Sequence, residues 1–240
     1  IYPFLNITNT TIFNNVMIIV NGEVDINCNS SLILMNSYLY INSSDFEGYH
    51  FIVRQGGTLI INNSVVTGPF EKYYWLFAER DSNVKITNSM IANAGWKDQR
   101  GTDEYIYIEP AYTRDYSYYG HGLEFNTTIR EFYGNTFINI SSIRFYASNN
   151  LIKDNTFIGV RHEALAFINS NNNIVENNTI LNALPRNRET HGIRFYPGCK
   201  NNTVVDNHIE GVIHAIMIAN IPPWTAGANF IIKRNYIKKL

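Results

Sequence analysis

One short motif returns eight times along this chain and constrains its fold more than any other feature. Most copies consist of Asn, then Ser or Thr, then apolar residues, as in Asn36-Ser37-Tyr38-Leu39. Repeats spaced by roughly 20–30 residues are typical of solenoids, in which each unit buries its apolar face by stacking on its neighbours. The copies, of which the last two are looser, begin at Asn36, Asn63, Asn88, Asn135, Asn155, Asn178, Asn207 and Asn235.

A second recurring segment reads as a β-strand with alternating inward and outward side chains. It is clearest in His191-Gly192-Ile193-Arg194-Phe195, and related segments begin at His121, Ser142, Ala164 and His214. A period of two predicts a strand and not a helix. We expect two interior columns, one of Leu123, Ile143, Leu165, Ile193 and Ile216, the other of Phe125, Phe145, Phe167, Phe195 and Ile218. The residues expected to point outward are Glu124, Arg144, Ala166, Arg194 and Met217.

The repeated Asn residues have a structural explanation. Asn tolerates the left-handed backbone conformation that a sharp corner needs, and its side chain bonds nearby backbone groups. Identical Asn side chains that stack on successive rungs also form hydrogen-bonded ladders. We therefore interpret the motif as scaffold and look elsewhere for function.

Together, the Asn-x-x-Ile-x-x-Asn-x-Ile/Phe repeat and the Gly-Ile-x-Phe strand resemble the right-handed parallel β-helix (pectate-lyase-like) superfamily. That superfamily includes pectate lyases, polygalacturonases, alginate-modifying enzymes, phage tailspikes and surface adhesins. The resemblance extends from about Asn14 to Leu240. It implies an all-β, single-stranded parallel β-helix of roughly nine or ten rungs in one domain spanning residues 1–240. The motif residues are specific for this fold and not for an activity.

Loop insertions are expected at one corner of the helix, where Thr67–Trp75, Asn93–Gly120 and Ala183–Thr190 lie. Residues 93–120 form a Tyr-rich insertion. Tyr and Trp faces stack on sugars and also dominate protein interfaces, so this loop and its surroundings are a candidate binding surface. The alternative is that the Tyr side chains only pack the loop against the helix body. The candidate binding residues are Tyr105, Tyr107, Tyr112, Tyr116, Tyr118 and Tyr119 in this loop, His121 and Glu124 beside it, and Trp224 in a further insert at a different corner, Asn220–Ala228.

The outward face of the Gly-Ile-x-Phe strands carries the candidate catalytic residues. In the enzymes that this chain resembles, the substrate groove runs along such a sheet, and an Arg neutralises a uronate carboxylate while a base removes the adjacent proton. The resemblance assigns the first role to Arg194 or Arg144 and the second to His191 or Glu163. The alternative is a solvated ladder of salt bridges. Convergence without mutual ion pairs would favour an enzyme, and pairing of each charge would disfavour one.

Several functions are disfavoured. The sheet lacks the Asp cluster of a calcium site, and the carboxylates of Glu124 and Glu163, expected about 10 Å apart, are too far apart for an inverting hydrolase. The six His residues lack metal-site spacing, so we expect neither metal nor cofactor. The net charge of −1 argues against nucleic acid, and no apolar stretch approaches the ~20 residues of a membrane span.

Composition indicates an extracellular or cell-surface glycoprotein. Only 16% of the residues are charged, and Asn, Ser, Thr and 16 Tyr take their place. We expect Cys28 and Cys199 to be inward-facing core thiols, too many rungs apart for a disulfide. The candidate glycosylation sites are the nine Asn-x-Ser/Thr positions Asn6, Asn9, Asn29, Asn42, Asn62, Asn126, Asn139, Asn177 and Asn201.

The sequence favours a non-catalytic surface or assembly protein that presents a stacked face for adhesion, glycan contact or protein contact. The alternative is a carbohydrate-active enzyme, a polysaccharide lyase or epimerase acting on uronates. The chain begins with Ile and its repeat stops mid-pattern at Leu240. We therefore expect either a longer protein or assembly with other subunits through the solenoid ends.

Overall fold

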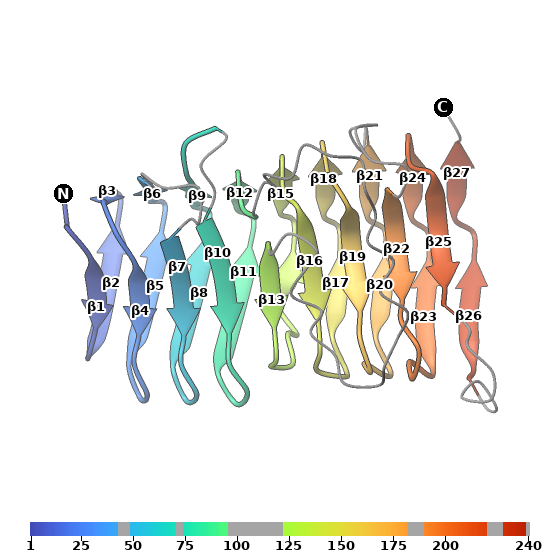
Figure 1. Ribbon diagram of the computed structural model, residues 1–240, viewed down its shortest axis with the longest axis horizontal. Helices are drawn as coiled ribbons and strands as arrows, with labels where there is room; N and C mark the ends of the chain where they lie inside the picture. Colours follow the sequence, from blue (N-terminus) through green and yellow to red (C-terminus); the bar gives the residue numbers. More distant parts are fainter. Residues whose placement is uncertain (43–48, 71–73, 96–121, 182–189, 220–227, 239–240) are drawn as a thin grey trace, which may run out of the picture.

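The chain winds into a coil in which β-strands of successive turns lie side by side along one axis (Figure 1). A computed structural model describes residues 1–42, 49–70, 74–95, 122–181, 190–219 and 228–238. Within these ranges, every regular element is a strand, and there is no helix that could cross a membrane. The predicted all-β parallel β-helix is confirmed.

Three parallel sheets form the walls of the helix, and each contains nine strands in the described part of the chain. The first sheet comprises β1 (Leu5–Ile7), β4 (Val24–Ile26), β7 (Tyr49–Val53), β10 (Tyr74–Ala78), β13 (Leu123–Phe125), β16 (Ser142–Phe145), β19 (Glu163–Phe167), β22 (His191–Phe195) and β25 (His214–Ile218). The second comprises β2 (Thr10–Asn14), β5 (Ser31–Met35), β8 (Thr58–Asn62), β11 (Asn83–Thr87), β14 (Phe132–Tyr133), β17 (Leu151–Lys153), β20 (Ile174–Glu176), β23 (Asn202–Val205) and β26 (Phe230–Lys233). The third comprises β3 (Met17–Val20), β6 (Tyr38–Ile41), β9 (Val65–Thr67), β12 (Met90–Ala92), β15 (Thr136–Ile138), β18 (Thr156–Ile158), β21 (Thr179–Leu181), β24 (His208–Glu210) and β27 (Tyr236–Lys238).

The predicted interior columns of the first sheet are present. The second column runs in register from Phe125 through Phe145, Phe167 and Phe195 to Ile218. Neighbouring Phe rings in it lie 4.8–5.5 Å apart between centroids, close enough to stack. The column is fully buried up to Phe195, whereas Ile218 in β25 is 37% exposed. Stacked aromatic rings therefore continue the core from rung to rung.

A continuous ladder of side chains, all buried except the partly buried Asn235, joins the corners between the second and third sheets. Each member after Ser37 accepts a hydrogen bond from the backbone N–H of the member one rung before it, as Asn155 Oδ1 does from Asn135 at 3.0 Å. Without these acceptors the buried N–H groups would have no partner, which costs about 1–3 kcal/mol for each group. The ladder comprises Ser37, Ser64, Ser89, Asn135, Asn155, Asn178, Asn207 and Asn235.

This ladder corrects the alignment of the motif. Asn36, Asn63 and Asn88 adopt the left-handed conformation, with φ near +50°. The ladder position is the next residue, so Ser37 and not Asn36 is equivalent to Asn135. The left-handed corner before Asn135 is taken by Gly134. The left-handed turn and the ladder hydrogen bond, which the sequence analysis assigns to a single Asn, are thus provided by two adjacent residues.

The two cysteines differ from each other. Cys199 is buried, as predicted, but Cys28 is exposed, so the expectation that it faces the core was wrong. Cys28 follows β4, at the corner where the chain leaves the first sheet. Side chains at such corners are not bound by the strict alternation of a strand. Both thiols are free.

Removing one ladder amide should destabilise the whole coil. Asn155→Ala leaves the buried N–H of Asn135 without its acceptor and the carbonyls of Phe132 and Lys153 without a donor. We expect the free energy of unfolding, measured by chemical denaturation, to fall by about 2–3 kcal/mol. Asn83→Ala, at an exposed strand position, is the control and should change it by less than about 0.5 kcal/mol. Equal effects of the two substitutions would contradict the role of the ladder.

Candidate functional site

The outward face of the first sheet gathers ionisable side chains on four consecutive strands. Glu124 in β13 pairs in register with Arg144 in β16, and Ser142 in β16 pairs with Glu163 in β19. Glu163 is in turn opposite His191 in β22. Together with Arg194 and Tyr196, we call Glu124, Arg144, Glu163 and His191 the charged cluster. Four of these six residues are the predicted catalytic set.

A β-bulge brings Glu163 onto this face. Ser142 pairs with Glu163 and Arg144 with Ala166, so β19 has one residue more than β16 between the two pairs. Strict alternation would put Glu163 on the same face as the inward Leu165, two residues further on. The extra residue re-aims the carboxylate towards the outward side chains, a common use of bulges.

Glu163 is the centre of the cluster and is fully buried. Its Oε1 accepts hydrogen bonds from the Tyr196 hydroxyl at 2.6 Å and from Arg194 Nη1 at 3.1 Å. Its Oε2 lies at ion-pair distance from His162 Nδ1, 3.6 Å, and Arg144 Nε, 3.8 Å. Burial alone would raise the pKa of Glu163, but His162, Arg144 and Tyr196 outweigh it and lower that pKa to about 2. Glu163 is thus a permanently ionised acceptor.

Arg144 links the two carboxylates of the cluster. Its Nη1 lies 3.3 Å from Glu124 Oε1, and only 2% of the residue is exposed. Burial by itself would lower the pKa of Arg144, but the charges of Glu163 and Glu124 raise it. The predicted position of Arg144 between the two carboxylates is therefore present. The predicted solvent exposure was wrong, since Glu124 and Arg144 are both buried.

His191 is held as a neutral imidazole. Arg194 Nη1 lies 3.3 Å from His191 Nε2, and because a guanidinium only donates, Nε2 is the acceptor. The pKa of His191 is lowered to about 4, chiefly by burial and then by the charge of Arg194. The ring of His214 in β25 stacks on it at 5.0 Å, and His162 meets it edge-on at 6.1 Å.

Four buried polar atoms in this region have no hydrogen-bond partner. They are Ser142 Oγ, Glu163 Oε2, His191 Nδ1 and Arg194 Nε. Unpartnered buried polar atoms are costly and call for an explanation such as a functional role or a bound molecule. Among the described residues, no group of three or more His, Cys, Asp or Glu is arranged to hold a metal ion.

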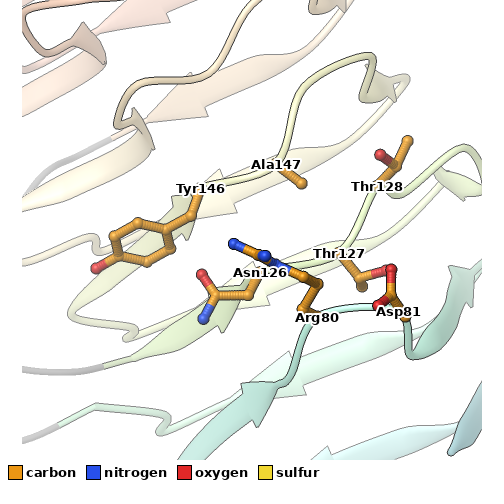
Figure 2. A pocket seen from close by; sticks show the side chains of 7 residues that line it. All are labelled: Arg80, Asp81, Asn126, Thr127, Thr128, Tyr146 and Ala147. Carbon is orange, nitrogen blue, oxygen red and sulfur yellow. The ribbon is translucent and has the colours of Figure 1, made fainter. Parts of the chain in front are cut away.

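A polar hollow of about 450 Å³ lies at the corner where β10, β13 and β16 leave the first sheet (Figure 2). Arg80 extends over it beside Asn126, and Asp81 lies near Thr127. Burial, followed by the charge of Glu124, raises the pKa of Tyr146 to about 12, so the phenol keeps its proton. The hollow is lined by Arg80, Asp81, Asn126, Thr127, Thr128, Tyr146 and Ala147.

Some of the other predicted binding and glycosylation residues lie within the described ranges, and others lie outside them. Tyr105, Tyr107, Tyr112, Tyr116, Tyr118, Tyr119, His121 and Trp224 lie outside the described residues, as does most of the 93–120 insertion. Of the nine glycosylation candidates, Asn6, Asn9, Asn29, Asn42, Asn177 and Asn201 are exposed. Asn62 and Asn126 are partly buried. Asn139 is buried, and its amide is bonded to Asn93 and Arg161.

The sequence analysis missed an aromatic group on the same outward face, nearer the N-terminus. Trp75 and Phe77 in β10 are partly exposed, and their rings lie 5.2 Å apart. Alternation in Tyr74-Trp75-Leu76-Phe77-Ala78 could have revealed them, since Tyr74, Leu76 and Ala78 are the buried positions. The strand lacks the Gly-Ile-x-Phe pattern that marks the other outward positions.

Comparison with known proteins agrees with this architecture. The family model described as "Right handed beta helix region" matches residues 57–239. The chain belongs to the right-handed β-helix family. No curated protein and no solved structure shows a significant match to it. In this β-helix protein the family therefore establishes the fold, and the function has to be argued from the face of the first sheet.

The neutral His191 predicts a specific loss of stability in mild acid. Its ordinary pKa of 6.5 in the unfolded chain lies above the folded value of about 4, so the unfolded state binds the extra proton. This stability is complete above pH 6.5 and is lost as the pH falls towards 4, by roughly 2 kcal/mol. Chemical denaturation at several pH values measures it.

Two variants distinguish the contribution of His191 to this pH dependence from the contributions of other titratable groups. His191→Gln keeps an acceptor for Arg194 but cannot be protonated, so the loss between pH 6.5 and 4 should largely disappear. His208→Gln is the control, because that side chain is 44% exposed beside Glu210. An unchanged pH profile in His191→Gln would refute the assignment.

Proposed function

We propose that this β-helix protein is non-catalytic and contacts a glycan or another protein through the outward face of its first sheet. The observation that carries the proposal is the mutual pairing of the charged cluster. Glu163, His191 and Arg194 converge, but Arg194 and Arg144 are both engaged with carboxylates. A guanidinium that is committed to Glu163 or Glu124 is a poor partner for a uronate carboxylate.

The protonation states support the same conclusion. With its pKa near 2, Glu163 does not take up a proton at neutral pH and is a weak general base. The Nε2 atom of His191, the nitrogen that could accept a proton, already accepts a hydrogen bond from Arg194. Burial, and then the charge of Glu163, raises the pKa of Tyr196. The phenol therefore keeps its proton and donates it in a hydrogen bond to Glu163.

We also propose an extracellular or cell-surface setting. The low charge of the chain supports it, together with six exposed Asn residues in glycosylation triplets. The partners that fit are a polysaccharide, a surface glycan or other protein subunits.

The second candidate is an elimination-type lyase or an epimerase acting on uronate-containing glycans. One observation favours it, namely the four buried polar atoms of Ser142, Glu163, His191 and Arg194 that have no hydrogen-bond partner. In such an enzyme, His191 would remove the proton next to the carboxylate and Arg194 would neutralise that carboxylate. This requires Arg194 to exchange Glu163 for the substrate.

Incubation with a panel of uronate polymers separates the two candidates. Because the cations are engaged, we expect no ultraviolet absorbance of an unsaturated uronate and no change in the uronate C5 configuration, the latter followed by NMR. Turnover by the wild-type chain that is lost in His191→Gln would contradict the proposal. His208→Gln serves as the matched control and should behave as the wild type does.

A further inference from the structure

An aromatic strip on the N-terminal half of the first sheet has no role in the charged cluster. It consists of the outward side chains of His50 and Ile52 in β7 and of Trp75 and Phe77 in β10. His50 pairs in register with Trp75, and Ile52 with Phe77. All four are partly exposed. Side chains of the same sheet thus form an apolar platform two strands wide.

The rings of the strip are fixed relative to one another. His50 meets Trp75 edge-on at 5.2 Å with an interplanar angle of 82°, and Trp75 and Phe77 are tilted by 35° at the same distance. Trp75 and Phe77 project from a strand whose alternate side chains, Tyr74 among them, are buried in the core. Rigid aromatic faces of this kind bind the apolar faces of sugar rings at a low entropic cost.

Charged groups flank the strip and are mainly acidic. They comprise three carboxylates, those of Glu23, Asp25 and Glu79, and one guanidinium, that of Arg54. Arg54 is bound by both Asp25 and Glu79, at 2.7 and 3.3 Å. The side chain of Glu23 is 60% exposed and lies 3.3 Å from His50. The strip therefore offers acceptors for hydroxyl groups and repels anions.

We propose that the aromatic strip binds a neutral polysaccharide, one whose sugar units carry hydroxyl groups but no carboxylates. The pyranose rings lie on Trp75 and Phe77, and their hydroxyl groups donate to the exposed carboxylate of Glu23. Electrostatic complementarity selects this occupant, because a uronate polymer would place its carboxylates beside an excess of negative charge. This inference rests on the proposed glycan-contact function and names its ligand class.

The test is calorimetric titration of the full chain with neutral polymers (a β-glucan, a xylan and a galactomannan) and with two acidic polymers, polygalacturonate and alginate. We expect at least one neutral polymer to bind and the acidic ones to bind at least tenfold more weakly. Trp75→Thr, which keeps a good strand former on the sheet, should weaken neutral binding about tenfold or more. Trp75→Tyr should retain most of it.

Matched controls keep the outcome clear. Tyr38→Thr removes a partly exposed aromatic side chain from the third sheet and should leave binding unchanged. Circular dichroism confirms that each variant is folded, and Phe77→Thr provides a second test if Trp75→Thr fails to fold. The proposal is overturned if no neutral polymer binds, if acidic polymers bind as tightly, or if folded Trp75→Thr and Phe77→Thr both bind like the wild type. Tight binding of an acidic glycan or a protein would sink this inference and leave the proposed function standing.

Discussion

The hydrogen-bonded ladder at the corner between the second and third sheets is the constraint on which the coil depends. Strands in a parallel sheet satisfy one another's backbone groups, but a corner leaves buried N–H groups with no strand to bond. Ser37, at one end of the ladder, and Asn235, at the other, belong to a single series of side chains that supply the missing acceptors. Because each side chain of the ladder accepts a hydrogen bond from the preceding rung, the rungs are held in one register. That register in turn fixes the columns of side chains on the outward faces.

That fixed register explains how one face of the molecule carries two different surfaces. Towards the N-terminus, the outward positions of β7 and β10 are aromatic and partly exposed. The next strand places Glu124 opposite Phe77, and from there several outward side chains, such as Arg144, are charged and buried. The first surface is the one on which we propose a glycan contact. The second satisfies its own charges, as a buried ionic network must if it is not to destabilise the fold.

Much of the fold could be predicted from the sequence, because a repeated pattern reports the same environment many times. The interior columns through Phe145 and Phe167 followed from alternation alone. The corner was harder, since Asn serves equally well in a left-handed turn and in a ladder, and only geometry shows that Ser37 corresponds to Asn135. The exposed Cys28 was missed for a related reason, because alternation does not extend past the end of a strand.

The sequence predicted which charged residues share the outward face, but not their environment, and it missed Tyr196 and His162, which contact Glu163. Position in the repeat placed Glu163, His191, Arg144 and Arg194 on one face, but the bulge in β19 that allows Glu163 to reach them has no sequence pattern of its own. Burial of Arg144 was not foreseen either, because outward alternation does not reveal what covers a sheet. Trp75 was overlooked because its strand lacks the Gly-Ile-x-Phe pattern.

We propose that the carboxylates and guanidinium groups of the charged cluster form a paired, ionised network around the neutral His191, and that this network does not act in acid–base catalysis. Carboxyl-carbon NMR of the full chain, followed as the pH is lowered, tests it directly at Glu163. The account predicts that Glu163 stays ionised until the pH approaches its folded pKa of about 2, below the range of ordinary glutamates. Titration of Glu163 near its ordinary pKa, or closer to neutrality as in a general acid, would contradict the account.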